Sequence, residues 1–153
     1  MYEKCFTLEP DAYVVRTVWT VAGDLRPRSV LIVDDVEDNR ELYAIYLDFL
    51  GFVVDTAADG TTALEKALAK RPDIMVLDFM LPGLDGWEIC RRVRKDPRTQ
   101  DVIIVALSGR TGKAVEREAM MAGCDAFHVK PCLPDDLAAT INRLLAERSA
   151  KGA

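Results

Sequence analysis

Five short apolar runs rich in β-branched residues alternate with longer amphipathic stretches from residue 29 onward, and this alternation most constrains the fold. The expected strands are 30–33, 52–56, 74–77, 102–107 and 126–129. Several of these runs are apolar throughout, which is typical of strands that are covered on both faces of a sheet. Parallel strands need long crossover connections, and the intervening stretches are long enough to form helices. The pattern therefore predicts an α/β fold with a doubly wound, five-stranded parallel sheet.

Helices are predicted between the strands and after the last one. The first helix is expected to follow Asp38, which could cap it, and to end at Gly51, because glycine commonly terminates helices. Its apolar face is predicted to contain Leu42, Ile45, Tyr46, Phe49 and Leu50. The other helices are expected at 61–70, 84–95, 113–121 and 133–147.

Length and charge limit the classes of function. The chain has 153 residues, which is the size of one domain, so a second output domain or output enzyme is not expected. A net charge of -5 disfavours DNA binding, because the phosphate backbone attracts basic surfaces. No apolar run reaches the roughly 18 residues of a membrane span, and the first residues lack the basic region of a secretory signal. A cytoplasmic protein without membrane contact is expected.

The cysteines do not indicate a metal site. They are Cys5, Cys90, Cys124 and Cys132. No two of them form a CxxC pair, and the single histidine, His128, cannot complete a usual zinc ligand set with them. Free thiols are therefore predicted, with His128 as a partly exposed strand residue.

Residues 1–28 do not fit the alternation and are predicted to form an N-terminal extension of unknown role. The run 12–21 is compatible with a strand, whereas 23–27 resembles a break before the main domain, which is expected over residues 29–147. Two interpretations stay open: a flexible extension that includes an over-assigned start codon, or an added strand or partner-binding arm. Residues 148–153 are predicted to be a frayed tail.

Polar residues come directly after four of the apolar runs. Asp34 and Asp35 follow the first run, Asp78 the third, Ser108 the fourth and Lys130 the fifth. Ligands of open parallel sheets bind beyond the carboxyl ends of the strands. Carboxylates gathered there repel one another by about 4 kcal/mol per pair, for charges about 4 Å apart at an effective dielectric of about 20. Lys130 supplies one compensating charge, and Mg²⁺, which prefers carboxylate, water and phosphate oxygens, is predicted to supply the rest.

The loop after the first run excludes two other sites that occur on this architecture. Its sequence, Asp34-Asp35-Val36-Glu37-Asp38, would repel a flavin phosphate, whereas a flavodoxin-like domain needs a cradle rich in glycine, serine and threonine. No GxGxxG motif follows the first run, which disfavours dinucleotide binding.

These motifs, in this order, resemble the response regulator receiver family of two-component systems, over residues 29–147. The matching pieces are Asp34-Asp35, the stretch 78–86 (DFMLPGLDG), Ser108 after its apolar run, and Lys130-Pro131. The resemblance implies a (βα)5 receiver fold with the flavodoxin-like strand order 2-1-3-4-5, similar to a stand-alone chemotaxis regulator.

The resemblance also implies the chemistry of the site. Asp78 would be the nucleophile that takes a phosphoryl group from a sensor histidine kinase or a phosphotransfer protein, becoming 4-aspartylphosphate. Mg²⁺ would be held by Asp35 and Asp78, by Asp34 through water, and by the backbone carbonyl of Met80. Mg²⁺ and Lys130 would stabilise the transferring oxygens.

A switch is implied in the same way. Ser108 would bond a phosphoryl oxygen and draw its loop inward, and Phe127 would turn from an exposed to a buried position. The Lys130-Pro131 bond would be cis and would aim the lysine into the site. The downstream protein is not identified by the sequence, and either a monomer or a phosphorylation-linked dimer is expected.

The sequence leaves two alternatives to this interpretation. The first is a receiver-fold interaction module that does not switch, in which residues 1–28 are the functional part; the repulsion within the acidic triad argues against it. The second is a phosphatase, which would need a second catalytic acid where Met80 stands. Trp87 and the basic run 91–95 are interpreted as the packing residue and the solvated face of one helix.

Overall fold

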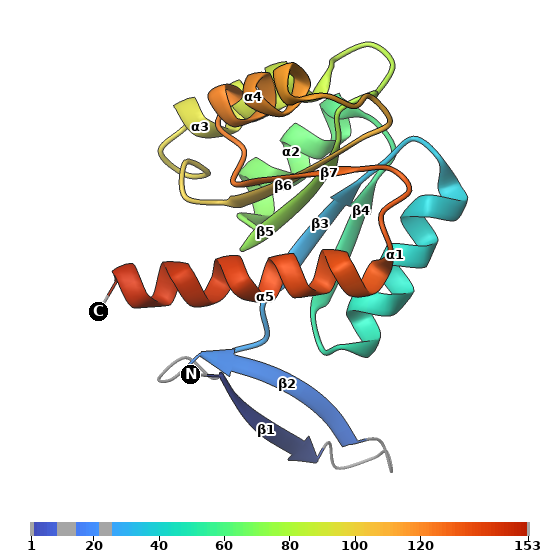
Figure 1. Cartoon of the computed structure of the whole chain (residues 1–153). Helices are drawn as coiled ribbons and strands as arrows, with labels where there is room; N and C mark the ends of the chain where they lie inside the picture. The colour runs from blue at the N-terminus through green and yellow to red at the C-terminus, as the bar shows by residue number, and fades with distance from the viewer. Residues whose placement is uncertain (1, 9–14, 22–25, 153) are drawn as a thin grey trace.

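The fold is described from a computed structural model of the chain, over residues 2–8, 15–21 and 26–152. The central sheet contains β3 (Ser29–Val33), β4 (Val53–Ala57), β5 (Ile74–Asp78), β6 (Ile103–Ser108) and β7 (Ala126–Val129). The helices that alternate with these strands are α1 (Glu37–Phe49), α2 (Gly60–Lys70), α3 (Gly86–Lys95), α4 (Lys113–Ala122) and α5 (Pro134–Lys151). The strands are parallel in the order β4-β3-β5-β6-β7, which confirms the predicted order 2-1-3-4-5 (Figure 1).

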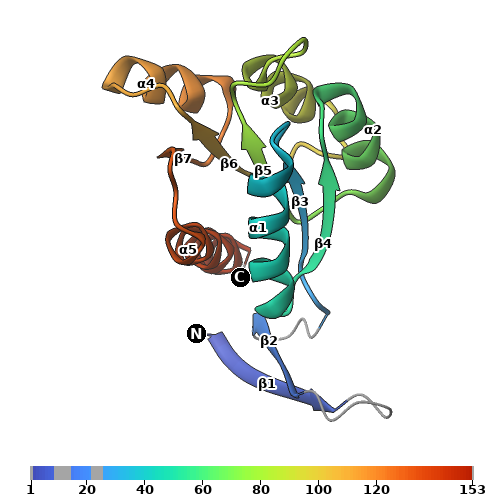
Figure 2. The same ribbon diagram turned by 90° about the vertical axis from the view of Figure 1, so that its right-hand side faces the viewer.

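The sheet is covered on both faces. Alternate residues of β3 and β5 point to opposite sides, so that Ile32 and Val76 face α1 and α5, whereas Leu31 and Met75 face α2, α3 and α4. The two helical layers lie on either side of the strands in Figure 2. This arrangement explains why the central runs are apolar throughout.

The predicted apolar face of α1 is partly wrong. Leu42, Ile45 and Phe49 are 53%, 71% and 79% exposed, whereas the buried residues of this helix are Tyr43 and Leu47. The helix carries two apolar stripes, and the periodicity alone does not say which of them faces the sheet. The hydroxyl of Tyr43 donates a 2.8 Å hydrogen bond to the carbonyl of Cys132. This bond holds the face of α1 that carries Tyr43 toward the sheet.

The predicted cap of α1 is also wrong. The helix follows Val36, no side chain caps its first turn, and Asp38 lies inside that turn. There its negative charge suits the positive end of the helix dipole. At the other end of the chain, α5 continues to Lys151, past the predicted end at 147, and Arg148 and Lys151 in its last turn complement the negative end of the dipole. Among the described helices, none is long and apolar enough to cross a membrane.

An antiparallel hairpin precedes the sheet. Its strands, β1 (Tyr2–Leu8) and β2 (Val15–Val21), pair so that Tyr2 lies opposite Val21 and Leu8 opposite Val15. Figures 1 and 2 place it beside α5, at the end of the sheet where β3 begins. The predicted strand 12–21 thus corresponds to β2 for its described part, since 12–14 lie outside the described residues, as does most of the predicted break at 23–27.

The chain is anchored to the main domain before the predicted boundary at residue 29. Asp73 accepts two hydrogen bonds from the guanidinium of Arg26, at 3.0 and 2.8 Å, and a 2.9 Å bond from the backbone N–H of Ser29. The carbonyl of Arg28 accepts a 2.9 Å bond from the N–H of Val53. Arg26 and Arg28, which belong to the predicted extension, are therefore bonded to the main domain.

Replacing Asp73 with asparagine is expected to lower the free energy of unfolding by about 2 kcal/mol at pH 7. Burial raises the pKa of Asp73, but the bonds from Arg26 and Ser29 outweigh burial, so the pKa lies below its ordinary value of 3.8. A carboxylate with a lowered pKa stabilises the fold above its unfolded-state pKa, and this stability disappears as the pH falls through the folded-state pKa. Urea unfolding at pH 7 and in acid measures both effects.

The difference in free energy of unfolding between the wild type and Asp73→Asn should therefore be smaller in acid than at pH 7. Glu147→Gln is the control, because the Glu147 side chain is about half exposed and its ion pair lies on the surface of α5. An equal loss of stability at neutral and acid pH would mean that the loss does not come from removing the charge of Asp73.

Candidate active site

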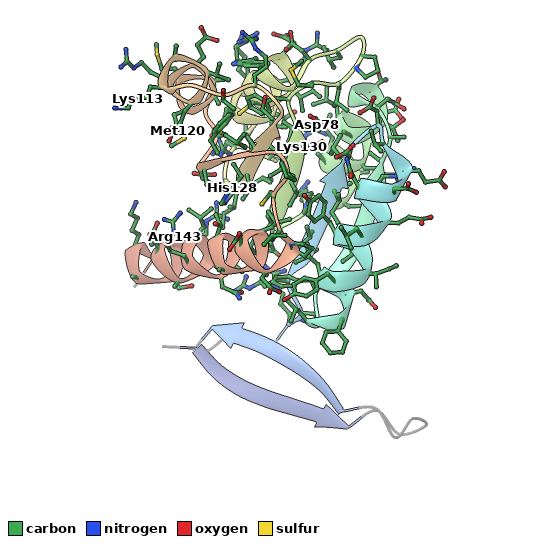
Figure 3. All side chains as sticks on the ribbon, turned by 45° about the vertical axis from the view of Figure 1, so that its right-hand side comes forward. Asp78, Lys113, Met120, His128, Lys130 and Arg143 are labelled. Carbon is green, nitrogen blue, oxygen red and sulfur yellow. The ribbon has the colours of Figure 1, made fainter. Side chains whose placement is uncertain are left out.

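The candidate site lies at the carboxyl ends of β3, β5, β6 and β7. Asp34 directly follows β3, Asp78 is the last residue of β5, Ser108 ends β6 and Lys130 follows β7. Because the strands are parallel, these four ends meet at one edge of the sheet. Figure 3 shows Asp78 and Lys130 side by side at this edge.

Lys130 bridges the two buried carboxylates. Its ammonium nitrogen lies 2.8 Å from Oδ2 of Asp34 and 3.0 Å from Oδ2 of Asp78. The two aspartates are 1% and 3% exposed. Buried carboxylates without partners are costly, so this bridge stabilises both charges.

The second oxygen of each carboxylate is bound by its own loop. Oδ1 of Asp34 accepts a 2.9 Å bond from the N–H of Val36, and Oδ1 of Asp78 accepts a 2.9 Å bond from the N–H of Met80. The guanidinium of Arg40 donates a 2.8 Å bond to the backbone carbonyl of Asp34. Both carboxylates therefore have a fixed orientation.

Asp35 completes an acidic triad. It is exposed, and ligand atoms of Asp34, Asp35 and Asp78 all lie within 4.8 Å of one another. Burial lowers the pKa of Lys130, but its bonds with Asp34 and Asp78 outweigh burial and leave the pKa above the ordinary 10.5. The lysine is therefore charged, and the formal net charge of the triad together with Lys130 is -2, from three carboxylates and one ammonium group. Hard oxygen donors with excess negative charge fit Mg²⁺.

Ser108 and the segment after β7 lie beside the triad. Ser108 is buried, and its hydroxyl oxygen accepts a 3.1 Å bond from the N–H of Arg110. The N–H of Lys130 donates a 2.8 Å bond to the carbonyl of Ser108, and the Lys130–Pro131 peptide bond is cis. Phe127 is half-buried and packs against the core on the α2–α4 side. The described structure thus brings the predicted polar residues to one place, whereas their roles stay predictions.

The loop after Asp78 is held by close packing. Phe79 is buried, and its N–H donates a 2.8 Å bond to the carbonyl of Leu107. A Cβ atom at position 86 would lie 2.6 Å from the Cα of Phe79, which leaves room only for glycine. Gly86 therefore allows α3 to begin against the backbone that carries Asp78.

Two arginines, Arg94 and Arg40, have structural roles that the sequence does not indicate. Arg94, predicted to lie on a solvated helix face, instead donates hydrogen bonds to the carbonyls of Gln100, Val102 and Gly123 and pairs with Asp125 at 2.8 Å. Arg40 holds the loop after β3, as described above. Neither has a local signal, because each reaches its partners through the tertiary fold. Two other members of the basic run, Arg91 and Arg92, pair with Glu88 on the surface of the helix, as predicted.

The predicted free thiols agree with the structure where it describes them. Cys90, Cys124 and Cys132 are buried and unpaired, while the side chain of Cys5 lies outside the described residues. Burial raises the pKa of Cys90 to about 11 and that of Cys124 to about 12. Such thiols are poor nucleophiles.

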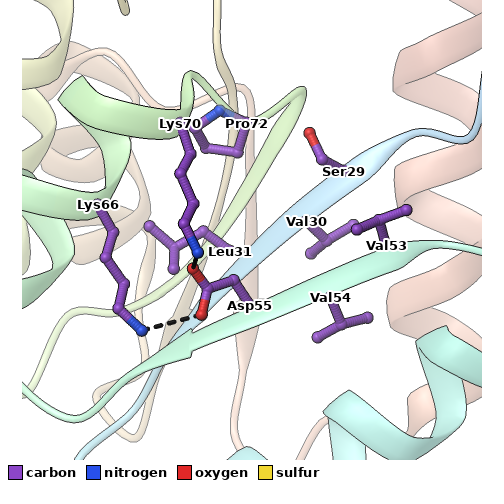
Figure 4. A pocket seen from close by; sticks show the side chains of 9 residues that line it. All are labelled: Ser29, Val30, Leu31, Val53, Val54, Asp55, Lys66, Lys70 and Pro72. Carbon is purple, nitrogen blue, oxygen red and sulfur yellow. Dashed lines mark hydrogen bonds and ion pairs between the residues drawn. The ribbon is translucent and has the colours of Figure 1, made fainter.

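A separate pocket lies at the opposite end of β3 and β4, away from the triad. Figure 4 shows Asp55 within it, bound by Lys66 at 2.9 Å and by Lys70 at 2.6 Å. Burial raises the pKa of Asp55, but the bonds from these lysines outweigh burial and lower the pKa to about 2. The charges of this pocket are already paired with one another, so it has no evident need for an ionic ligand.

Comparison with known proteins extends these observations. Residues 30–142 match the family described as "Response regulator receiver domain". The chain is 37% identical to the response regulator PleD of Caulobacter vibrioides over 102 residues, which are 67% of this chain and 22% of PleD. It is 36% identical to the response regulator Rre1 of Synechocystis over 125 residues, which are 81% of this chain and 54% of Rre1.

A solved structure is similar over nearly its whole length. The chemotaxis protein CheY4 of Vibrio cholerae superposes with a TM-score of 0.74 at 32% identity, covering 77% of this chain and 98% of CheY4. The chain spans only about half of Rre1 and less of PleD, so similarity to those two concerns their receiver portions.

Proposed function

Because this chain belongs to the response regulator receiver domain family, we propose that Asp78 accepts a phosphoryl group from a sensor histidine kinase or a histidine phosphotransfer protein. The observation that carries this proposal is the position of the Asp78 carboxylate. It is buried, one oxygen lies 3.0 Å from the Lys130 ammonium, and two further carboxylates adjoin it. A nucleophile, a cation for the transferring oxygens and a set of metal donors thus meet at one point.

The transfer exchanges one phosphorus bond for another. A carboxylate oxygen of Asp78 forms a bond to phosphorus while the bond between phosphorus and the donor's histidine nitrogen breaks, and the imidazole keeps the electron pair. Lys130 stays charged and stabilises the transferring oxygens. Mg²⁺ would be held by Asp35, Asp78, Asp34 through water and the Met80 carbonyl, and it would neutralise charge on the phosphoryl group.

The phosphoryl group is proposed to act through Ser108 and Phe127. The Ser108 hydroxyl would donate to a phosphoryl oxygen, and its loop would move toward Asp78. Phe127, which is half-buried, would then complete its burial. The product of this step is a changed surface rather than a second reaction, so the domain signals to a downstream protein partner.

Several finer features belong to the same proposal. The domain acts as a signalling module in the cytoplasm, does not bind DNA, and works as a monomer or a phosphorylation-linked dimer. The net charge of -5 supports the absence of DNA binding, because the phosphate backbone of DNA attracts basic surfaces. The hairpin formed by β1 and β2 is given no part in the transfer.

The proposal is tested by intact mass measurement of the full chain after incubation with acetyl phosphate. With Mg²⁺ the chain should gain the mass of one phosphoryl group, and without Mg²⁺ the gain should be far slower. A folded chain that gains no mass under either condition would instead support an interaction module that does not switch.

Replacing Asp35 with asparagine is expected to abolish the stabilisation of the protein by Mg²⁺ while leaving its melting temperature without metal nearly unchanged. Asp35 is exposed and makes no bond to Lys130, so its loss removes a metal donor but no buried partner. Millimolar Mg²⁺ at about 100 times its dissociation constant would stabilise the wild type by about 2.7 kcal/mol. Thermal unfolding with and without Mg²⁺ measures this, with Glu41→Gln, on the exposed side of α1, as the control. A metal-induced shift that survives in the variant would remove Asp35 from the ligand set.

A further inference from the structure

We infer that Arg110 is a second cation for the phosphoryl group, held on the face of Trp87 until Asp78 is phosphorylated. This inference rests on the proposed function. It assigns a phosphoryl-binding role to Arg110 and a positioning role to Trp87, two side chains that the transfer step itself does not use.

The resting place of Arg110 adjoins the site. The guanidinium carbon of Arg110 lies 6.0 Å from the centre of the Trp87 ring, within the range of a cation–π contact. The Trp87 ring in turn packs against Phe79, with ring centres 4.7 Å apart and planes tilted by 57°. Phe79 directly follows Asp78. Trp87 therefore holds the cation beside the loop that begins directly after Asp78.

The backbone also ties Arg110 to the site. The N–H of Arg110 donates a 3.1 Å bond to the hydroxyl oxygen of Ser108, and Leu107 lies opposite Asp78 in the pairing of β5 with β6. A serine hydroxyl can accept from Arg110 and donate its own hydrogen to a phosphoryl oxygen at the same time. Movement of Ser108 toward that oxygen would therefore carry Arg110 in the same direction.

Charge balance supplies the driving force. The triad and Lys130 carry two net negative charges, which one bound Mg²⁺ cancels. Phosphorylation replaces the single charge of Asp78 with about two negative charges, so the loaded site again has an excess of about one. Arg110 is exposed and has no carboxylate partner within ion-pair distance among the residues that the structure describes. Arg110 is therefore a positive charge, close to the site, that could offset the excess negative charge of the phosphorylated site.

Arg110 is bound more weakly on Trp87 than it would be on the phosphoryl group. An exposed cation–π contact raises the ratio of bound to unbound guanidinium by roughly 2- to 5-fold. A charge-assisted hydrogen bond to a phosphoryl oxygen raises that ratio by roughly tenfold or more. The indole N–H of Trp87 has no hydrogen-bond partner in the described part of the chain, so packing alone positions the ring. Trp87 therefore competes weakly with the phosphoryl group for Arg110.

The test uses beryllofluoride, which converts a carboxylate into an adduct with one more negative charge, as phosphorylation does. The full chain is titrated with beryllofluoride in excess Mg²⁺, and the midpoint of the rise in melting temperature is compared between variants. Arg110→Gln should weaken beryllofluoride binding by about tenfold. Trp87→Leu should strengthen it by roughly 2- to 5-fold, because the competing site is removed. The double variant should match Arg110→Gln alone.

Two results distinguish movement of Arg110 from a general structural role of these residues. The single variants change beryllofluoride affinity in opposite directions, and Trp87→Leu has no effect once Arg110 is replaced. Arg117→Gln, an exposed charge on α4, should bind as the wild type does, and Trp87→Phe should lie between wild type and Trp87→Leu. Arg110→Gln binding within twofold of wild type, or a Trp87→Leu effect that persists without Arg110, would overturn the inference. Failure of the wild type itself to bind beryllofluoride would overturn the proposed function instead.

Discussion

Asp78→Asn is expected to abolish the Mg²⁺-dependent gain of a phosphoryl group from acetyl phosphate. The amide cannot act as the nucleophile, and its single oxygen can keep only one of the two bonds that the carboxylate oxygens now accept, from Lys130 and from the N–H of Met80. Because the substitution also lowers the excess negative charge of the pocket, the variant should stay folded. Intact mass spectrometry of both proteins, over the same series of acetyl phosphate incubations, measures the loss.

The same variant should be more stable than the wild type, by about 1 kcal/mol, because it removes one charge from a pocket with excess negative charge. Asp38→Asn, which changes a carboxylate in the first turn of α1, is the matched control and should be labelled as the wild type is. Labelling of Asp78→Asn at the wild-type rate would place the phosphoryl group on another residue and remove Asp78 from its proposed role.

Arg94→Met is expected to destabilise the protein by about 2–3 kcal/mol and to lower its melting temperature by about 10 °C. Arg94 joins α3 to the turn after α4 and to the start of β6, through three backbone carbonyls and Asp125. Methionine keeps the apolar stem but leaves these acceptors without their donor. Asp125 also accepts a 2.8 Å bond from the N–H of Ile104, so the disturbance reaches the central sheet.

Arg91→Met is the control for this prediction. It lies on the same helix, but its partner Glu88 is on the surface, so its loss should change stability by less than about 0.5 kcal/mol. Denaturant unfolding of the three proteins gives the comparison. Equal stabilities of the Arg91 and Arg94 variants would contradict the anchoring role of Arg94.

The strands and the acidic site were predictable because both depend on local patterns. A strand buried on both faces must be apolar along its length, and a charged residue that follows such a run must lie at its end, as Asp34, Asp78 and Lys130 do. Parallel topology then brings the ends together. No tertiary information is needed for that step, which is why the site emerged from the sequence together with the sheet.

The errors concern choices that only the assembled fold makes. Helix α1 has two apolar stripes, and the bond of Tyr43 to a distant carbonyl decides which one faces inward. Asp38 had the right chemistry for a cap, but the chain turns into the helix at Val36. The hydrogen bonds of Arg94 to residues distant in the sequence produce no pattern in the sequence from which they could be predicted. Strand β1 lies outside the βα alternation and was not predicted, whereas β2 falls within the run 12–21 that was compatible with a strand.

The bridge that Lys130 makes to Asp34 and Asp78 has a consequence for how the site is loaded. The ammonium group occupies an oxygen of both buried carboxylates, which are the atoms a divalent cation also seeks. Under the proposed function, Lys130 would be a tethered counterion for the two carboxylates when no metal is bound. A metal held by Asp35 and Asp78 would compete with the lysine for the Asp78 carboxylate, and the released ammonium would then be available to the phosphoryl oxygens. Metal binding and release of the lysine would therefore be coupled, and competition from the lysine would keep the metal exchangeable.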